Sequence, residues 1–293
     1  MTLRESLAGK GIILLDGATG TQLSARGHSP GGMQNLLHPD DVRAVHESYL
    51  AAGSRAITTN TLTDNRIFLE SHGQASDVAE VNRAGAALAR EAVNARRPGA
   101  FVLGDLSSTG QLLEPYGDAT ESQFIATFTE QAGILAAAGV DGFLIETVMD
   151  LREAVCAVRG CREASSLPIL VTMSFQNLKD GGRTAMGSRA ADCGESLARE
   201  GADAVGANCG DLDPFDTAEI MTVLRGACGL PLIAQPNAGK PRLVKDAAVF
   251  DMQPARFADG VALCIQRGAR LVGGCCGTTP AHIAALARLI PAG

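Results

Sequence analysis

The 293-residue chain has no tryptophan and only two tyrosines, Tyr49 and Tyr116, so aromatic residues make up 4% of it. Proteins that bind quaternary ammonium groups surround the cation with aromatic ring faces, because the electron-rich faces attract it. Phe68 and Phe175 offer two further rings, but no cage is evident in the sequence. This scarcity argues against a ligand that is recognised mainly through a quaternary ammonium group.

The chain also lacks a basic tract, a long apolar run and an apolar core near its N-terminus. Its formal net charge is −7, so we expect no nucleic-acid partner. No apolar run is long enough to span a bilayer, and no signal-peptide pattern is present, so we expect no membrane partner and a cytoplasmic location. Hydrophobic residues still make up 46% of the chain, which is enough for a large core.

Cysteine is not scarce, and the eight cysteines fall into two groups. In an intracellular chain of this size they argue against a disulfide framework. Three of them follow short apolar runs and are candidate ligands. The other five lie in helix-like stretches and are interpreted as small buried hydrophobic residues; they are Cys156, Cys161, Cys193, Cys228 and Cys264.

Short β-rich runs recur along the whole chain, and the segments between them have helical periodicity. Eight βα units in succession predict a single (β/α)8 barrel, the TIM-barrel fold, as one domain over residues 1–293. A doubly wound open sheet is the alternative. The predicted strands are residues 12–15, 56–59, 101–104, 142–145, 168–173, 203–207, 232–234 and 270–273.

The active site of such a barrel lies at the C-terminal ends of its strands. Asp16 follows the first predicted strand and Glu146 follows the fourth. Cys209 lies at the end of the sixth, and Cys275 and Cys276 lie at the end of the eighth. Closure of the barrel brings these ends to one rim, so we expect the three thiols to meet although they are far apart in sequence.

Three thiols at one place predict a zinc site, because zinc takes soft thiolate ligands and three protein ligands leave a fourth position open. Three thiolates already cancel the charge of the ion, which makes it a weak activator of water. A thiol in the fourth position would lose its proton and remain nucleophilic. The predicted chemistry is attack of a substrate thiol on an electrophilic carbon, and methyl transfer fits. The alternative is three buried thiols without metal.

A carboxylate and a turn of small residues occupy positions 16–21. Asp16 and Glu146 suit an ammonium group, and the free N–H groups of the turn suit a carboxylate, so together they predict an amino-acid ligand. Helix capping or structural hydrogen bonding is the alternative role for both acids. The turn lacks the glycine patterns of phosphate-binding loops.

The chain resembles the homocysteine S-methyltransferase family at residues 16–21, 58–61, 206–210 and 273–277, and the similarity extends from end to end. Residues 108–115, 182–187 and 235–241 are most similar to the homocysteine-binding module of cobalamin-dependent methionine synthase. The resemblance implies a zinc-dependent barrel enzyme that methylates homocysteine to methionine. It implies Cys209, Cys275 and Cys276 as ligands of Zn²⁺, and Asp16, Gly17, Ala18, Thr59 and Glu146 around homocysteine.

The methyl donor is left open by the sequence. The chain departs from the family pattern at residues 34, 63–64 and 107–108, on the expected donor side. The poverty in aromatic residues favours S-methylmethionine, S-adenosylmethionine or methylcobalamin over betaine. The chain has no Asp-x-His-x-x-Gly cobalamin signature, so methylcobalamin would have to arrive on a separate corrinoid carrier protein.

Two other functions remain as alternatives. The first is a non-catalytic zinc- or homocysteine-binding subunit of a split methionine synthase. The second is a barrel aldolase or synthase that holds a phosphate at the glycine pair Gly273 and Gly274. The second leaves the thiols unexplained, and no lysine lies at the end of a predicted strand.

Overall fold

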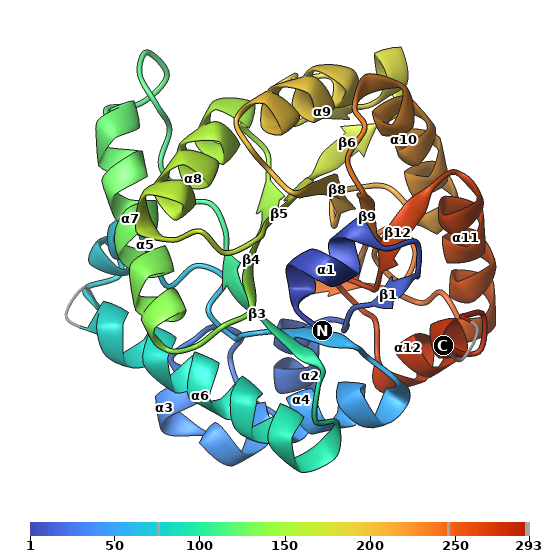
Figure 1. Cartoon of the computed structure of the whole chain (residues 1–293), viewed down its shortest axis with the longest axis horizontal. Helices are drawn as coiled ribbons and strands as arrows, with labels where there is room; N and C mark the ends of the chain where they lie inside the picture. The colour runs from blue at the N-terminus through green and yellow to red at the C-terminus, as the bar shows by residue number, and fades with distance from the viewer. Residues whose placement is uncertain (75–76, 245–246, 291–293) are drawn as a thin grey trace.

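A computed structural model describes residues 1–74, 77–244 and 247–290. Eight parallel strands form a nearly closed barrel with helices around it, which confirms the predicted fold class (Figure 1). All eight predicted strands are present. They are β1 (Ile13–Leu14), β2 (Ala56–Thr58), β3 (Phe101–Leu106), β4 (Gly142–Val148), β5 (Ile169–Met173), β8 (Ala204–Asn208), β9 (Leu232–Gln235) and β12 (Ala269–Val272).

Several helices begin at residues that favour a helix start. Thr120 and Asp213 form capping boxes, and Pro280 occupies the first turn of the last helix. None of the helices in the described ranges is long and apolar enough to cross a membrane. The α-helices are α1 (Leu3–Ala8), α2 (Thr19–Ala25), α3 (Gln34–Leu37), α4 (Pro39–Ala52), α5 (Arg66–Ser71), α6 (Val78–Arg96), α7 (Glu121–Ala137), α8 (Leu151–Ala164), α9 (Ala190–Arg199), α10 (Pro214–Ala227), α11 (Pro254–Gln266) and α12 (Pro280–Ala287).

The strands pair in the order β1-β12-β9-β8-β5-β4-β3-β2, which leaves a seam between β1 and β2. Several hydrogen bonds bridge that seam, and two of them come from backbone N–H groups. The backbone N–H of Arg55 donates to the carbonyl of Leu14 at 2.7 Å, and the backbone N–H of Thr58 donates to Asp16 Oδ2 at 2.8 Å. The Asp16 carboxylate therefore helps to close the barrel.

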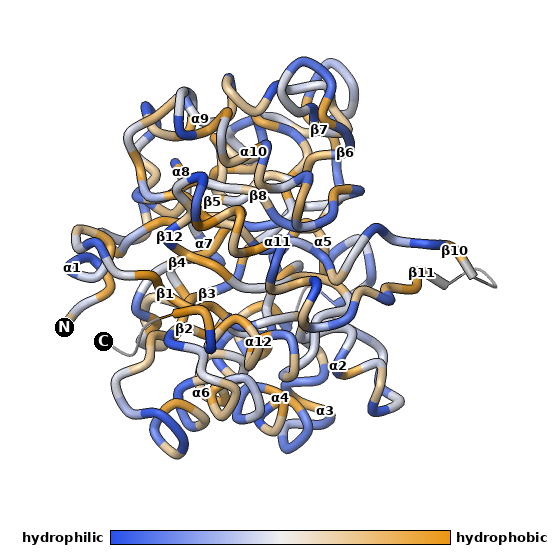
Figure 2. The backbone as a smooth tube through the Cα atoms, turned by 90° about the vertical axis from the view of Figure 1, so that its right-hand side faces the viewer, coloured by the Kyte–Doolittle hydropathy of each residue, from blue (hydrophilic) through white to orange (hydrophobic). Residues whose placement is uncertain are grey.

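Two antiparallel hairpins were not predicted from the sequence. They are β6 (Phe175–Asn177) with β7 (Arg183–Thr184), and β10 (Arg242–Val244) with β11 (Ala247–Val249). Both lie in βα loops on the side of the barrel away from α1 (Figure 2). Strands of two or three residues give no readable alternation of apolar and polar residues, which is why periodicity missed them.

The barrel interior follows the two-residue period of its strands. On β3 the side chains of Phe101 and Leu103 point into an inner apolar cluster, and Leu144 on β4 and Ile233 on β9 join them. A separate outer cluster packs the strands against the helices. Two positions after these leucine and isoleucine residues, the same period directs Asp105 on β3, Glu146 on β4 and Gln235 on β9 toward the interior. Polar side chains thus form the layer above the apolar one.

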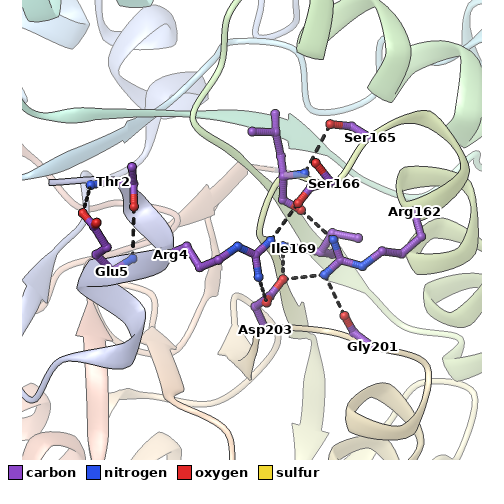
Figure 3. A network of polar contacts seen from close by, with 10 residues as sticks. Thr2, Arg4, Glu5, Arg162, Ser165, Ser166, Ile169, Gly201 and Asp203 are labelled. Carbon is purple, nitrogen blue, oxygen red and sulfur yellow. Dashed lines mark hydrogen bonds and ion pairs between the residues drawn. The ribbon is translucent and has the colours of Figure 1, made fainter.

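Helix α1 covers the opposite end of the barrel, near its axis (Figure 1). Leu3 and Leu7 belong to the inner apolar cluster, so the helix seals it from below. Arg4 anchors the helix by donating to Asp203 Oδ1 at 3.1 Å and to the carbonyl of Ser166 at 2.7 Å (Figure 3). Arg162 holds the other oxygen of Asp203. This end is apolar and closed, so solvent reaches the interior from the other end.

We predict that Leu3→Ala lowers the free energy of unfolding by about 2–5 kcal/mol, because it leaves a cavity at the sealed end of the barrel. Urea unfolding followed by circular dichroism measures the change. Leu112→Ala, at a side chain that is 45% exposed, is the control and should change stability by about 0.5 kcal/mol or less. Equal losses in the two variants would contradict the sealing role of α1.

Candidate active site

A pocket of about 420 Å³ opens where the C-terminal ends of the strands meet. It is lined by the β1 turn, by the loop at residues 30–32, and by the ends of β2, β3, β4, β8, β9 and β12. All eight residues singled out from the sequence lie in its wall. They are Asp16, Gly17, Ala18, Thr59, Glu146, Cys209, Cys275 and Cys276.

The three predicted thiols come together at this pocket. Their sulfur atoms all lie within 4.8 Å of one another, and Cys209 Sγ is 3.8 Å from Cys276 Sγ. Cys209 follows β8 with a φ of 53°, which turns its side chain toward β12. Gly210 follows with a φ of 69°, and a Cβ there would lie 2.2 Å from the Phe175 carbonyl, so only glycine fits the turn.

The chain after β12 is held by the segment that follows β9. The Cys275 N–H donates to the Pro236 carbonyl at 2.9 Å, and the Cys276 carbonyl accepts from Ala238 N–H at 3.0 Å. Two adjacent cysteines are thereby held with both sulfurs near Cys209. The donor set is three soft thiols open to a pocket, which fits zinc and leaves one side for a further ligand.

The thiols also hydrogen-bond one another, and these bonds give the thiols different pKa values. Hydrogen bonds with Cys209 and Cys276, followed by burial, hold the pKa of Cys275 well above its usual range. Hydrogen bonds from Cys209 and Cys275 lower the pKa of Cys276 to about 4. The cluster therefore titrates as one unit, in which one sulfur carries charge most readily.

Asn208 ties the thiol cluster to the carboxylate on β4. Its Nδ2 donates to Glu146 Oε2 at 3.0 Å and to Thr147 Oγ1 at 2.7 Å, and lies 3.7 Å from Cys275 Sγ. Its Oδ1 accepts from Thr147 N–H at 2.8 Å. Thr147 has a φ of 61° at an irregularity in the β4 ladder, which directs Glu146 to the pocket. Asn208 is therefore a positioning residue.

The turn after β1 is held by Thr278. A Cβ on Gly17 would lie 2.7 Å from Thr278 Oγ1 and 2.9 Å from Tyr49 Cε1, so the close approach requires glycine. The Ala18 N–H donates to Thr278 Oγ1 at 3.1 Å, and Tyr49 Oη donates to the Ala18 carbonyl at 2.9 Å. One of the turn's amides is thus already bonded. Helix α2 starts at Thr19, and its first N–H groups have no partner within the helix.

Thr59 lies in the pocket wall but its hydroxyl already has protein partners. It lies 2.6 Å from Thr61 Oγ1 and accepts from Asp105 N–H at 3.0 Å. The expected contact between Thr59 and a substrate remains a prediction.

The site prediction omitted Asp105, Asn208 and Gln235. Asp105 and Gln235 line the pocket, and each is buried with one side-chain oxygen, Oδ1 and Oε1, that lacks a hydrogen-bond partner. The position of all three residues near the ends of predicted strands was the sequence signal that could have identified them. The third and fourth strands were predicted to stop at 104 and 145, but β3 runs to Leu106 and β4 to Val148, so Asp105 and Glu146 lie inside strands.

Three carboxylates line the pocket, and within the part of the chain that the structure describes no lysine, arginine or histidine lines it. Burial raises the pKa of Asp16 to about 7, although the hydrogen bonds from Thr58 act to lower it. Burial and the nearby charges of Asp16 and Cys209 raise the pKa of Glu146 to about 8. Burial and the charge of Glu146 raise the pKa of Asp105 well above its usual range. A positively charged ligand group would relieve this repulsion.

Comparison with known proteins assigns the family. The sequence profile of homocysteine S-methyltransferase matches residues 13–290. The chain belongs to the homocysteine S-methyltransferase family. This confirms the family that the sequence motifs resemble.

Relatives of this family member include both long and short proteins. It is 30% identical to methionine synthase from Mycobacterium tuberculosis over 95% of its own length, and 29% identical to that from Mycobacterium leprae over 98%. The chain spans about a quarter of the length of these relatives. The chain is also similar to homocysteine methyltransferase MmuM from Escherichia coli, whose crystal structure is known in a metallated form. The two sequences are 26% identical and the TM-score is 0.79. The match covers 98% of this chain and 99% of MmuM.

The family member's five other cysteines are remote from this pocket. Cys156 and Cys161 on α8, Cys193 on α9 and Cys264 on α11 are buried, as predicted. Cys228 is partly exposed and caps the end of α10 rather than lying inside a helix. The cluster of Cys209, Cys275 and Cys276 alone matches the zinc site expected of homocysteine methyltransferases.

We predict that Asp105→Asn raises the free energy of unfolding at high pH, by about 1–3 kcal/mol. Asp105 has a folded-state pKa above that of the unfolded chain, so the wild-type protein loses stability as pH rises from about 4 through that raised value. The amide cannot ionise, and the advantage of the variant should grow with pH.

Urea unfolding at about pH 5 and about pH 9, without added homocysteine, measures this difference. Asp259→Asn, at an exposed position on α11, is the control and should change stability little at either pH. A stability difference for Asp105→Asn that is the same at both pH values would contradict the prediction.

Proposed function

We propose that the protein transfers a methyl group to the thiol of homocysteine and so forms methionine, with Zn²⁺ held by Cys209, Cys275 and Cys276. The observation that carries this proposal is the meeting of three thiols, from the ends of β8 and β12, in the wall of an acidic pocket. Bound there, zinc supplies a position at which a substrate thiol ionises at neutral pH.

The protein's own residues bind and orient the amino-acid end of homocysteine. Asp16 after β1 and Glu146 on β4 line the pocket and accept hydrogen bonds from its ammonium group, and Asp105 comes from β3 between those strands. The turn at Gly17 and Ala18 and the first N–H groups of α2 face its carboxylate. Asn208 fixes the distance between the ammonium site and the sulfur site, because it contacts both Glu146 and Cys275.

The composition of the pocket favours a sulfonium donor. No aromatic side chain lines it, so a quaternary ammonium such as betaine would find no ring face. Its carboxylates favour a donor that carries positive charge, as S-methylmethionine and S-adenosylmethionine do. Methylcobalamin delivered by a corrinoid carrier protein is the second candidate, supported by similarity to the longer methionine synthases.

Neither alternative function is favoured by an observation in this pocket. A phosphate-binding aldolase or synthase would use cationic side chains, whereas the described lining residues include three carboxylates and no lysine or arginine. A non-catalytic subunit would share the zinc and homocysteine sites, so an activity assay separates it from the enzyme.

A donor screen tests the proposed function. Zinc-loaded protein and homocysteine are incubated with S-methylmethionine, S-adenosylmethionine, betaine, or methylcobalamin with and without a corrinoid carrier protein, and methionine is measured. We expect fastest turnover with a sulfonium donor. Fastest turnover with betaine would refute the donor assignment, and no methionine from any donor would favour the non-catalytic alternative.

We predict that Cys275→Ser abolishes stoichiometric zinc binding, because it removes one of three thiolates. Metal analysis after dialysis against a weak chelator measures the zinc content. Cys228→Ser is the matched control, since Cys228 lies outside the cluster, and it should retain one zinc per chain. Full retention of zinc by Cys275→Ser would refute the three-thiolate site.

We predict that Glu146→Gln weakens homocysteine binding by about 1–3 kcal/mol, the usual cost of losing a charged hydrogen bond, while zinc content stays unchanged. Isothermal titration calorimetry on the zinc-loaded protein measures the affinity. Glu195→Gln, at an exposed site on α9, is the control and should bind as the wild type does. Unaltered affinity in Glu146→Gln would remove Glu146 from the ammonium site.

A further inference from the structure

A second group of potential metal ligands lies outside the active-site pocket. His28, His38 and Asp41 each offer one ligand atom, and these atoms all lie within 4.8 Å of one another. None of the three residues lines the pocket that holds the cysteines. Two imidazoles and a carboxylate form a ligand set that suits borderline divalent metals such as Zn²⁺, Ni²⁺ and Co²⁺.

The local structure brings these residues together before any ion is present. His28 lies in the loop after α2, where its N–H donates to the Leu23 carbonyl at 3.1 Å. His38 precedes α4 and Asp41 lies in the first turn of that helix. The rings of His28 and His38 are stacked with centroids 4.1 Å apart, and His28 Nε2 lies 2.8 Å from Asp41 Oδ2.

The ligand atoms already lie near the spacing that one ion requires, but the stacked rings must turn so that their nitrogen lone pairs converge on it. Metal–ligand bonds of about 2.1 Å in a tetrahedral site place ligand atoms about 3.4 Å apart. His38 is exposed and Asp41 is 43% exposed, so rotation of these side chains brings the ligand atoms to that spacing. Arg26 Nε lies 3.9 Å from the other oxygen, Asp41 Oδ1, whereas Oδ2 is bonded to His28 Nε2 and is the oxygen that would pass to the ion.

We propose that His28, His38 and Asp41 form a second site, which binds one borderline divalent transition-metal ion and fastens the loop at residues 26–33 to α4. The stacked imidazoles provide two nitrogen donors beside one carboxylate, and the ion replaces the hydrogen bond between His28 and Asp41. The proposal does not depend on the proposed methyl transfer.

The loop at residues 26–33 also forms part of the active-site pocket. Pro30, Gly31 and Gly32 line the active-site pocket, two to four residues beyond His28. The Gly31 carbonyl accepts from Asn60 Nδ2 at 3.1 Å, which ties the loop to the end of β2. Metal binding at the outer site therefore joins a pocket wall to α4 and reduces the motion of that wall.

Cobalt titration of the zinc-loaded protein tests the site. We expect one additional Co²⁺ per chain, with visible d–d absorption but without the intense sulfur-to-metal band that cobalt at the cysteine cluster would produce. His38→Ala should weaken this binding by about tenfold or more. His72→Ala, which removes another exposed histidine outside the cluster, is the matched control and should bind as the wild type does.

Hydrogen exchange supplies a second readout. Amide exchange at residues 26–33 should slow when cobalt is added to the wild-type protein and to His72→Ala, but not in His38→Ala. Absence of an additional cobalt ion would overturn the proposal. Cobalt binding that carries the sulfur band, or that is unchanged in His38→Ala, would do so as well.

Discussion

The burial of ionisable groups on top of an apolar barrel is the constraint on which the rest of this structure depends. The inner cluster that includes Leu103, Leu144 and Ile233 excludes water from below, and Asp105, Glu146 and Gln235 continue the same inward columns. Removal from water raises the pKa values of the acids and strengthens every interaction of a charge that enters. The same packing that stabilises the barrel therefore prepares its mouth for a cation and a metal.

This arrangement trades stability for function. Asp105 and Gln235 each keep a buried oxygen without a partner, which costs free energy in the folded protein. Asn208 offsets part of that cost, since one amide satisfies Glu146 and Thr147 and lies beside a cysteine. The wall of the pocket thus contains buried oxygen atoms that lack a hydrogen-bond partner among the described residues.

The N-terminal segment contributes at both ends of the barrel. Helix α1 seals the apolar end through Leu3 and Leu7, and the segment from Asp16 to Gly32 builds one wall of the pocket at the other. Asp16 also bridges the seam between β1 and β2 through Thr58. The same carboxylate thus bridges the seam of the barrel and lines the pocket.

The sequence by itself determined the fold class, the eight strands and the three cysteines, because period-two apolar runs, helix caps and thiols are local signals. It also placed Asp16 after the first strand, but it put Glu146 at the end of the fourth, whereas β4 continues to Val148. Only the tertiary structure decided which strand-end groups face the pocket, as for Asp105, and which are already bonded, as for the Thr59 hydroxyl and the Ala18 amide. It likewise brought His28 beside His38 and Asp41. Side-chain direction and hydrogen-bond partners depend on residues far apart in the chain, which no local pattern records.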